Sequence, residues 1–127
     1  MLLEGIFAAM TTPFYPDGRL YLRKLEHNMD RYSRTPIAGV VVLGSTGEAV
    51  MLGDDETREV LRVAREAAAA EKVLLAGVTR ESALETLKLA EFAATCHLLI
   101  DCPGEKVASK VALRRRYTAQ LGETGAS

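Results

Sequence analysis

The sequence has few cysteines, no tryptophan, and no hydrophobic run long enough for a membrane helix. Its two cysteines, Cys96 and Cys102, are too few for a disulfide scaffold, and their spacing is not that of a zinc or redox motif. A membrane-spanning helix needs about 20 consecutive apolar residues. The N-terminus also lacks the basic region of a signal peptide. We therefore expect reduced thiols in a cytoplasmic protein that binds neither metal nor membrane.

The chain also lacks an excess of charge of either sign. Its 16 Lys and Arg residues oppose 17 Asp and Glu residues, which gives a formal net charge of −1. A near-neutral chain has no global basic field that would attract nucleic acid. The basic run Arg114–Arg116, beside Tyr117, is short and typical of a solvated helix face. We therefore expect no nucleic-acid partner.

What the sequence does contain is one pattern, repeated four times: an apolar run, then a turn, then a helical stripe. With 127 residues and 48% hydrophobic content, the chain is predicted to fold as one domain. Its β-type runs are 5–12, 37–43, 73–78 and 98–102, and its predicted helices are 20–34, 54–70, 82–94 and 107–121. The spacing from Ser82 to Glu85 is that of a capping box. Leu84, Leu87 and Ala94 or their neighbours are expected to be buried in the helix that follows.

Alternating strands and helices predict an α/β fold with a parallel sheet and right-handed crossovers. Two architectures remain open at this point: an open doubly wound sheet, or part of a (β/α)8 barrel. In both, ligands bind at the carboxyl ends of the strands. The predicted functional segments are therefore Thr11–Thr12, Gly44–Glu48, Gly77–Thr79 and Asp101–Glu105.

The segment Gly44-Ser45-Thr46-Gly47-Glu48 is the most informative of these. Two glycines let backbone N–H groups turn toward an anion, and two hydroxyls add further donors. A tight turn with an exposed Ser-Thr pair is the alternative interpretation. The segment is neither a Walker A loop nor a dinucleotide-binding turn. It could serve as the phosphate cradle of a flavodoxin-like domain, although such a loop normally follows the first strand and this one follows the second.

Several segments together resemble the N-terminal half of the dihydrodipicolinate synthase / N-acetylneuraminate lyase family of class I aldolases. In chain order they are Gly5-Ile6, Thr12-Pro13-Phe14, Asp17-Gly18, Gly39-Val40, Gly44–Glu48 with Leu52, Val73 with Ala76-Gly77, and Ser82-Ala83 with Glu85 and Ala90. Order and spacing agree from residue 5 to about residue 94. We therefore treat 1–127 as a single partial barrel domain, with 1–94 well matched and 95–127 weakly matched or degenerate.

The resemblance implies a partial (β/α)8 TIM barrel comprising about the first four βα units. It also implies a lyase or aldolase that joins pyruvate to a second substrate, or releases it, through a Schiff base. Ser45, Thr46 and Gly47 would bind the carboxylate of pyruvate or a related 2-keto acid. Ser45 would also supply a proton-relay hydroxyl. The resemblance implies no cofactor.

This chain departs from the family pattern at three catalytic positions. The Schiff-base lysine of the family lies on the sixth strand, and so does not correspond to Lys24, Lys72, Lys88, Lys106 or Lys110. One relay tyrosine belongs to the fifth strand, and where the family has a second one this chain reads Cys102-Pro103-Gly104-Glu105. Lys106, near the rim, is an ordinary surface lysine with little nucleophilic character. We therefore expect the chain to be inactive alone.

Half of a barrel would leave two unpaired sheet edges. It would also leave an inward layer partly bare, and the strand pattern assigns this layer to Ala8, Met10, Val40, Val42, Leu74 and Ala76. We expect a homo-oligomer, or association with a chain that completes the barrel. A non-catalytic half-barrel that binds a partner chain is the alternative function.

The remaining polar residues are predicted to have structural roles. His27 is expected to face solvent and His97 to lie in a turn. The acids Asp54–Glu56 open a helix, where they complement its dipole and cannot all face one metal ion.

Overall fold

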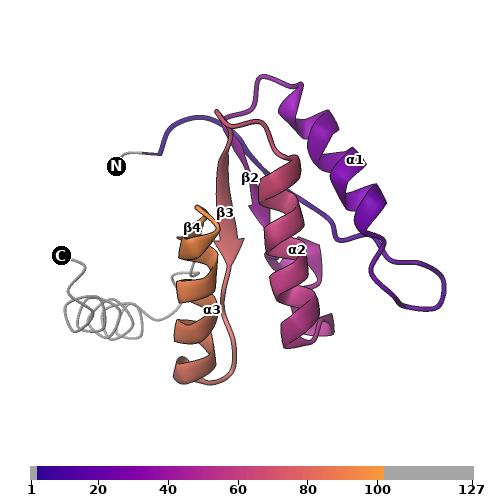
Figure 1. Ribbon diagram of the computed structural model, residues 1–127. Helices are drawn as coiled ribbons and strands as arrows, with labels where there is room; N and C mark the ends of the chain where they lie inside the picture. Colours follow the sequence, from indigo (N-terminus) through magenta and orange to yellow (C-terminus); the bar gives the residue numbers. More distant parts are fainter. Residues whose placement is uncertain (1–2, 102–127) are drawn as a thin grey trace.

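The computed structural model describes residues 3–101, in which four strands alternate with three α-helices (Figure 1). The strands are β1 (Phe7–Ala9), β2 (Gly39–Val42), β3 (Val73–Gly77) and β4 (Leu99–Asp101). The α-helices are α1 (Leu22–Ser33), α2 (Asp54–Ala67) and α3 (Ala83–Thr95). Two short 3-10 turns, η1 (Ser45–Gly47) and η2 (Ala49–Met51), separate β2 from α2. The predicted helix over 107–121 and the segment Cys102–Glu105 lie outside the described residues.

The four strands form one parallel sheet in the order β1-β2-β3-β4. The order follows the chain without reversal, and the three helices cover one face of the sheet (Figure 1). A doubly wound sheet reverses its strand order and has helices on both faces. The open doubly wound alternative, and the flavodoxin-like interpretation with it, is therefore wrong. The arrangement is that of a partial (β/α) barrel.

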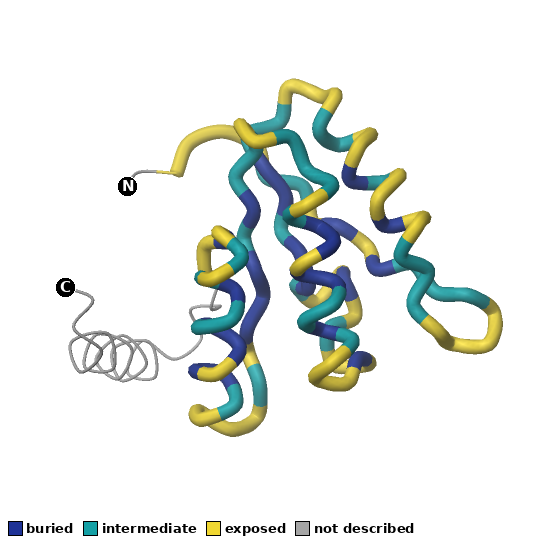
Figure 2. The backbone as a smooth tube through the Cα atoms, viewed as in Figure 1, coloured by how far each residue is buried: buried dark blue, intermediate teal, exposed yellow. Residues whose placement is uncertain are grey.

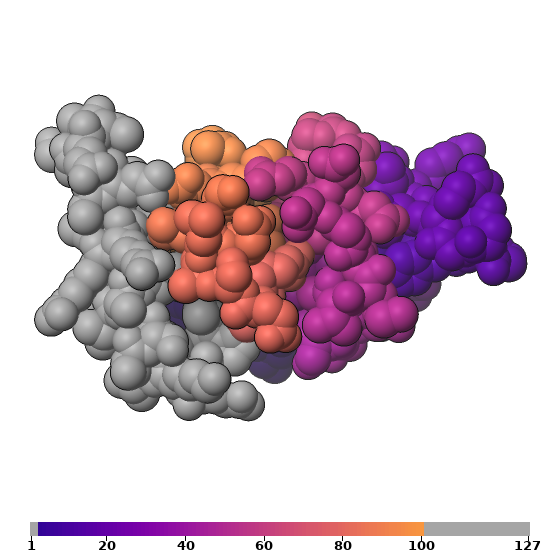
Figure 3. Space-filling model, turned by 90° about the horizontal axis from the view of Figure 1, so that it is seen from below, coloured from indigo at the N-terminus to yellow at the C-terminus, as the bar shows by residue number. Residues whose placement is uncertain are grey.

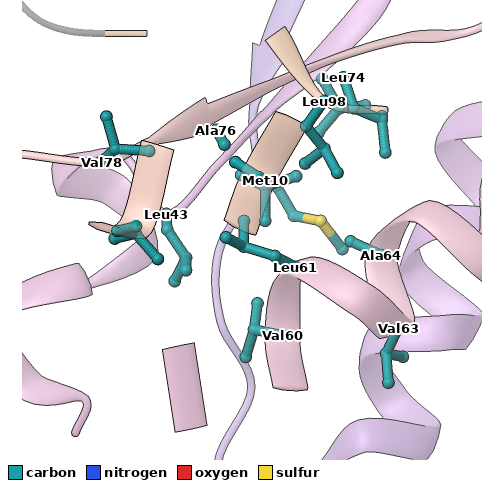
Figure 4. Close-up of a cluster of buried hydrophobic side chains, with 14 of the residues drawn as sticks. Met10, Leu43, Val60, Leu61, Val63, Ala64, Leu74, Ala76, Val78 and Leu98 are labelled. Atoms are coloured by element: carbon teal, nitrogen blue, oxygen red, sulfur yellow. The ribbon is translucent and has the colours of Figure 1, made fainter. Parts of the chain in front are cut away.

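The core lies between the sheet and the helices (Figure 2). The strand residues Leu74 and Ala76 belong to one buried cluster with Val60, Leu61 and Ala64 of α2, and Figure 4 shows the side chain of Met10 next to that of Leu61. All six side chains are at most 2% exposed. Burial of this apolar layer drives the docking of helices on the sheet, at roughly 25 cal/mol for each Å² removed from water.

The observed packing shows that the predicted inward-facing layer of the sheet was assigned to the wrong residues. Met10, Val40, Val42, Leu74 and Ala76 are buried on the helix side, and Ala8 is half-buried beside them. The opposite face carries the alternate residues, which the register aligns in one row: Ala9, Val41, Leu75 and Leu99. The assignment was wrong by one residue because every strand is apolar on both faces, so alternation gives no signal.

The helix ends follow the predicted capping chemistry only in part. Ser82 is the N-cap of α3, and its hydroxyl accepts a hydrogen bond from the Glu85 N–H at 3.0 Å. Leu87 is buried as expected, but Leu84 is 56% exposed and Ala94 is only half-buried. Leu84 occupies the first turn of α3, which lies beyond the end of the sheet. At the start of α2, the Glu56 side chain accepts from the Gly53 N–H, and Asp54 and Asp55 are exposed.

Candidate functional site

The loop after β2 lies at the carboxyl end of the sheet, which Figure 3 views directly. It comprises Gly44–Glu48 and contains the single turn η1. The residues Leu43, before that turn, and Glu48, after it, have a left-handed backbone conformation, with φ values of 59° and 55°. Such a backbone costs a residue other than glycine about 1–2 kcal/mol. At Leu43 the cost is offset by packing, because its side chain is 2% exposed and lies in the core (Figure 4).

A buried hydroxyl ties this loop to the first strand. Thr12, just after β1, donates a hydrogen bond from its Oγ1 to the carbonyl oxygen of Gly47 at 2.6 Å. Both residues are buried. A Cβ on Gly47 would lie 3.2 Å from the Met10 carbonyl oxygen and 3.4 Å from Thr12 Oγ1. The second glycine of the motif therefore leaves room for close packing between the loop and β1, which a side chain at this position would crowd.

The loop leaves a group of hydrogen-bond donors free. The Gly47 and Glu48 N–H groups close the turn by donating to the carbonyls of Gly44 and Ser45. Within residues 3–101, no carbonyl accepts from the N–H groups of Ser45 or Thr46, and neither side-chain hydroxyl has a partner. Both residues are exposed. The loop therefore offers two backbone amides and two hydroxyls to an anion, and needs no positive side chain to do so.

The end of β3 packs directly against the start of this loop. A Cβ on Gly77 would lie 2.0 Å from the Leu43 carbonyl oxygen, so only glycine fits there. Further along, Arg80 connects the β3–α3 segment to α2 through an Nη2 hydrogen bond to Thr57 Oγ1 at 2.9 Å. The Arg80 N–H also donates to Thr86 Oγ1 at 3.0 Å. Three successive βα connections are thus joined at the carboxyl end of the sheet.

None of the lysines in the described part lies on the loop. Lys24 and Lys88 are exposed on α1 and α3, and Lys88 pairs with Glu85. Lys72 precedes β3 at the amino end of the sheet, opposite the loop. Its Nζ donates to the carbonyls of Thr35 and Ile37 at 2.7 and 2.8 Å, which is a structural role. Lys106 and Lys110 lie outside the described residues.

The other polar candidates form no site. His27 is exposed on α1, and His97 has a φ of 61° in the turn before β4, as expected for both. Residues 3–101 hold no cluster of three metal-ligating side chains. No helix among them is both long and apolar enough to cross a bilayer. On the outer face of α2, Arg62 donates a hydrogen bond to the Glu66 carboxylate, and this bond, with the charges of Glu59 and Glu66, raises the pKa of Arg62.

The fold and the loop define a class: a partial parallel (β/α) barrel with a turn rich in hydrogen-bond donors after its second strand. A family comparison agrees, because residues 2–97 match the model of the dihydrodipicolinate synthetase family. The chain belongs to that family.

Relatives named for two different activities share this segment. The chain is 33% identical to 4-hydroxy-tetrahydrodipicolinate synthase of Xanthomonas axonopodis pv. citri over 98% of its length, and 31% identical to N-acetylneuraminate lyase of Haemophilus influenzae over 97%. Among solved structures, N-acetylneuraminate lyase of Mycoplasma synoviae matches 74% of the chain with a TM-score of 0.70 and 30% identity. The chain spans 42% and 43% of the two curated relatives and 33% of the solved chain.

The structure therefore brings Ser45, Thr46 and Gly47 together on one turn, with the first two exposed and the third buried. Their roles with a substrate stay predictions. Sequence reasoning placed Thr12 at the functional end of the sheet but gave it no role. The available signal was a hydroxyl residue just before the proline that ends the first strand. Arg80 and Thr57 were missed, because a contact between residues 23 positions apart leaves no local pattern.

Proposed function

We propose that loop 44–48 binds the carboxylate of pyruvate or a related 2-keto acid, for aldol chemistry through a Schiff base. The observation that supports this is the set of free donors on one exposed turn: the amides and hydroxyls of Ser45 and Thr46. Preformed donors of this kind stabilise a carboxylate without side-chain rearrangement. Family membership supplies the reaction class, and relatives named as a synthase and as a lyase leave the second substrate open.

The chemistry divides between this chain and residues it does not contain. An amine must add to the keto carbon, lose water to give an iminium, and so provide an electron sink for making or breaking a carbon–carbon bond. In the proposed division, the loop holds the carboxylate and Ser45 Oγ relays a proton. The amine comes from the family's sixth strand, outside these 127 residues. The 127-residue chain is therefore a ligand-binding part of an aldolase and is inactive alone.

Amide NMR of the 127-residue chain, titrated with sodium pyruvate, tests the binding role. The proposal predicts saturable shifts centred on the amides of Ser45, Thr46 and Gly47. Lactate should reproduce them because it keeps the carboxylate, whereas acetone should not. The variants Ser45→Ala and Thr46→Val should weaken binding severalfold. The matched control Thr35→Val removes an exposed hydroxyl at the opposite end of the sheet and should leave binding unchanged.

Shifts centred away from the loop, or equal weakening by the control, would refute the proposal. So would the absence of shifts at the highest soluble pyruvate concentration. Inorganic phosphate serves as the competing anion. If phosphate shifted the loop amide resonances strongly and pyruvate did not, the loop would be an anion-binding site that does not recognise keto acids.

A further inference from the structure

Arg80 lies in the short segment between β3 and α3, at the carboxyl end of the sheet. Its backbone N–H donates to Thr86 Oγ1 of α3 at 3.0 Å, which holds the residue against that helix. Its guanidinium donates from Nη1 to the Thr79 carbonyl at 3.0 Å and from Nη2 to Thr57 Oγ1 of α2 at 2.9 Å. Arg80 therefore joins the first turns of α2 and α3, which lie at the same end of the molecule (Figure 1).

The side-chain partners of Arg80 are neutral oxygens. Within residues 3–101, no carboxylate forms an ion pair with it. Thr57 is fully buried, and its hydroxyl is used in both directions: it accepts from Arg80 and donates to the Gly53 carbonyl at 2.9 Å. A guanidinium is a rigid fork that can hold two acceptors in one fixed geometry. The contact therefore fixes the position of Thr57, and of Gly53 behind it, relative to the end of β3.

Gly53 ends the chain segment that begins with loop 44–48. The loop itself is tied to β1 by the buried threonine hydroxyl. The turn η2, which follows the loop, adds little anchoring, because Val50 and Met51 are 92% and 71% exposed. At the far end, Leu52 is buried and the Gly53 carbonyl accepts the hydroxyl of α2. The far end of the segment is therefore held where Arg80 acts.

We propose that Arg80 is a positioning residue for the keto-acid loop. Through Thr57 it fixes Gly53, and thereby the far end of the segment that carries the loop. Within residues 3–101, none of the hydrogen bonds of Arg80 reaches the loop itself, so this inference rests on the proposed function of the loop. The effect is geometric, because donors that are already held in place bind a carboxylate without rearrangement.

Substitutions in the 127-residue chain test the proposal, with pyruvate affinity measured by amide NMR. Arg80→Met and Thr57→Val should each weaken binding by about threefold or more, which is typical of residues that act on a site through others. The double variant should bind about as weakly as either single variant, because both break the same contact. Thr57→Ser keeps the hydroxyl and should bind as the wild type does. The matched control Arg58→Met removes a neighbouring guanidinium of α2, 4.8 Å from the ring centroid of Phe92 on α3, and should leave affinity unchanged.

Hydrogen exchange of the ligand-free chain tests the positioning without any keto acid. The amides of Gly47 and Glu48 close the turn of the loop. They should exchange faster in Arg80→Met and Thr57→Val, and at the wild-type rate in Thr57→Ser and Arg58→Met. The amides of β3 should stay protected in all four variants, which distinguishes a local effect on the loop from global destabilisation.

Unchanged exchange at the two loop amides in Arg80→Met would overturn the inference, whether or not pyruvate binds. Weaker binding in Arg80→Met but not in Thr57→Val would also overturn it, because the charge of Arg80 would then be responsible. Equal weakening by Arg58→Met would assign the effect to helix packing in general and would count against it too. If the wild-type chain bound no pyruvate, the proposed function would fail, and the exchange rates would still decide whether Arg80 positions the loop.

Discussion

Replacing Thr12 with valine tests how the carboxyl end of the sheet is held together. Valine keeps the shape of threonine but removes the hydroxyl that donates to the Gly47 carbonyl at 2.6 Å. Thr12 is only 6% exposed, so water replaces that donor poorly. Leaving a buried carbonyl without a partner costs about 1–3 kcal/mol. At roughly 4 °C for each kcal/mol in a domain of this size, the melting temperature should fall by about 4–12 °C.

The assay is thermal unfolding at one fixed protein concentration, because association changes apparent stability. Thr12→Ser is the matched control: it keeps the hydroxyl and loses one methyl group, at a cost of about 0.8 kcal/mol. Hydrogen exchange provides a local readout. In Thr12→Val, the Gly47 and Glu48 amides that close the loop turn should exchange faster than in Thr12→Ser. If the valine variant were as stable as the serine variant, with unchanged exchange at these amides, the assigned role of Thr12 would be wrong.

Three further substitutions test separate parts of the structure by urea unfolding. Gly77→Ala places a Cβ 2.0 Å from the Leu43 carbonyl oxygen, so it should destabilise by about 3 kcal/mol and shift the loop amides in NMR. Ser82→Ala removes the cap of α3 and should cost about 1 kcal/mol, while Ser82→Asp should restore most of it. Lys72→Met loses two hydrogen bonds to carbonyls and should cost about 1 kcal/mol, because Lys72 is partly solvated. Pyruvate binding should not change in Lys72→Met, since that side chain lies at the opposite end of the sheet.

Much of the fold could be predicted from the sequence because each element has a local signal. The apolar runs ended at turns, two of the three α-helices began at Ser82 or at a run of acids, and the strand–helix alternation predicted a parallel sheet. The choice between a barrel and a doubly wound sheet had no such local signal. It depends on strand order, which the structure shows directly. The face assignment of each strand was wrong for the same reason that the strands were easy to find: they are apolar throughout.

The candidate loop was found from its glycines and hydroxyls, but its construction could not be predicted. A leucine and a glutamate stand in the left-handed backbone region on either side of the turn, where sequence preference favours glycine. At Leu43, tertiary packing determines the left-handed backbone conformation, because the side chain is buried in the core. The contacts of Thr12 with Gly47 and of Arg80 with Thr57 likewise arise only when distant βα units meet.

Reductive trapping tests whether this chain carries a lysine that forms a Schiff base with pyruvate. The 127-residue chain is incubated with pyruvate and borohydride, and its intact mass is measured. We expect an unmodified mass, because Lys24 and Lys88 are exposed on helices and the Lys72 ammonium is held by two carbonyls. A stoichiometric pyruvate adduct on any one lysine would show that the chain is not inactive alone and would identify the nucleophile.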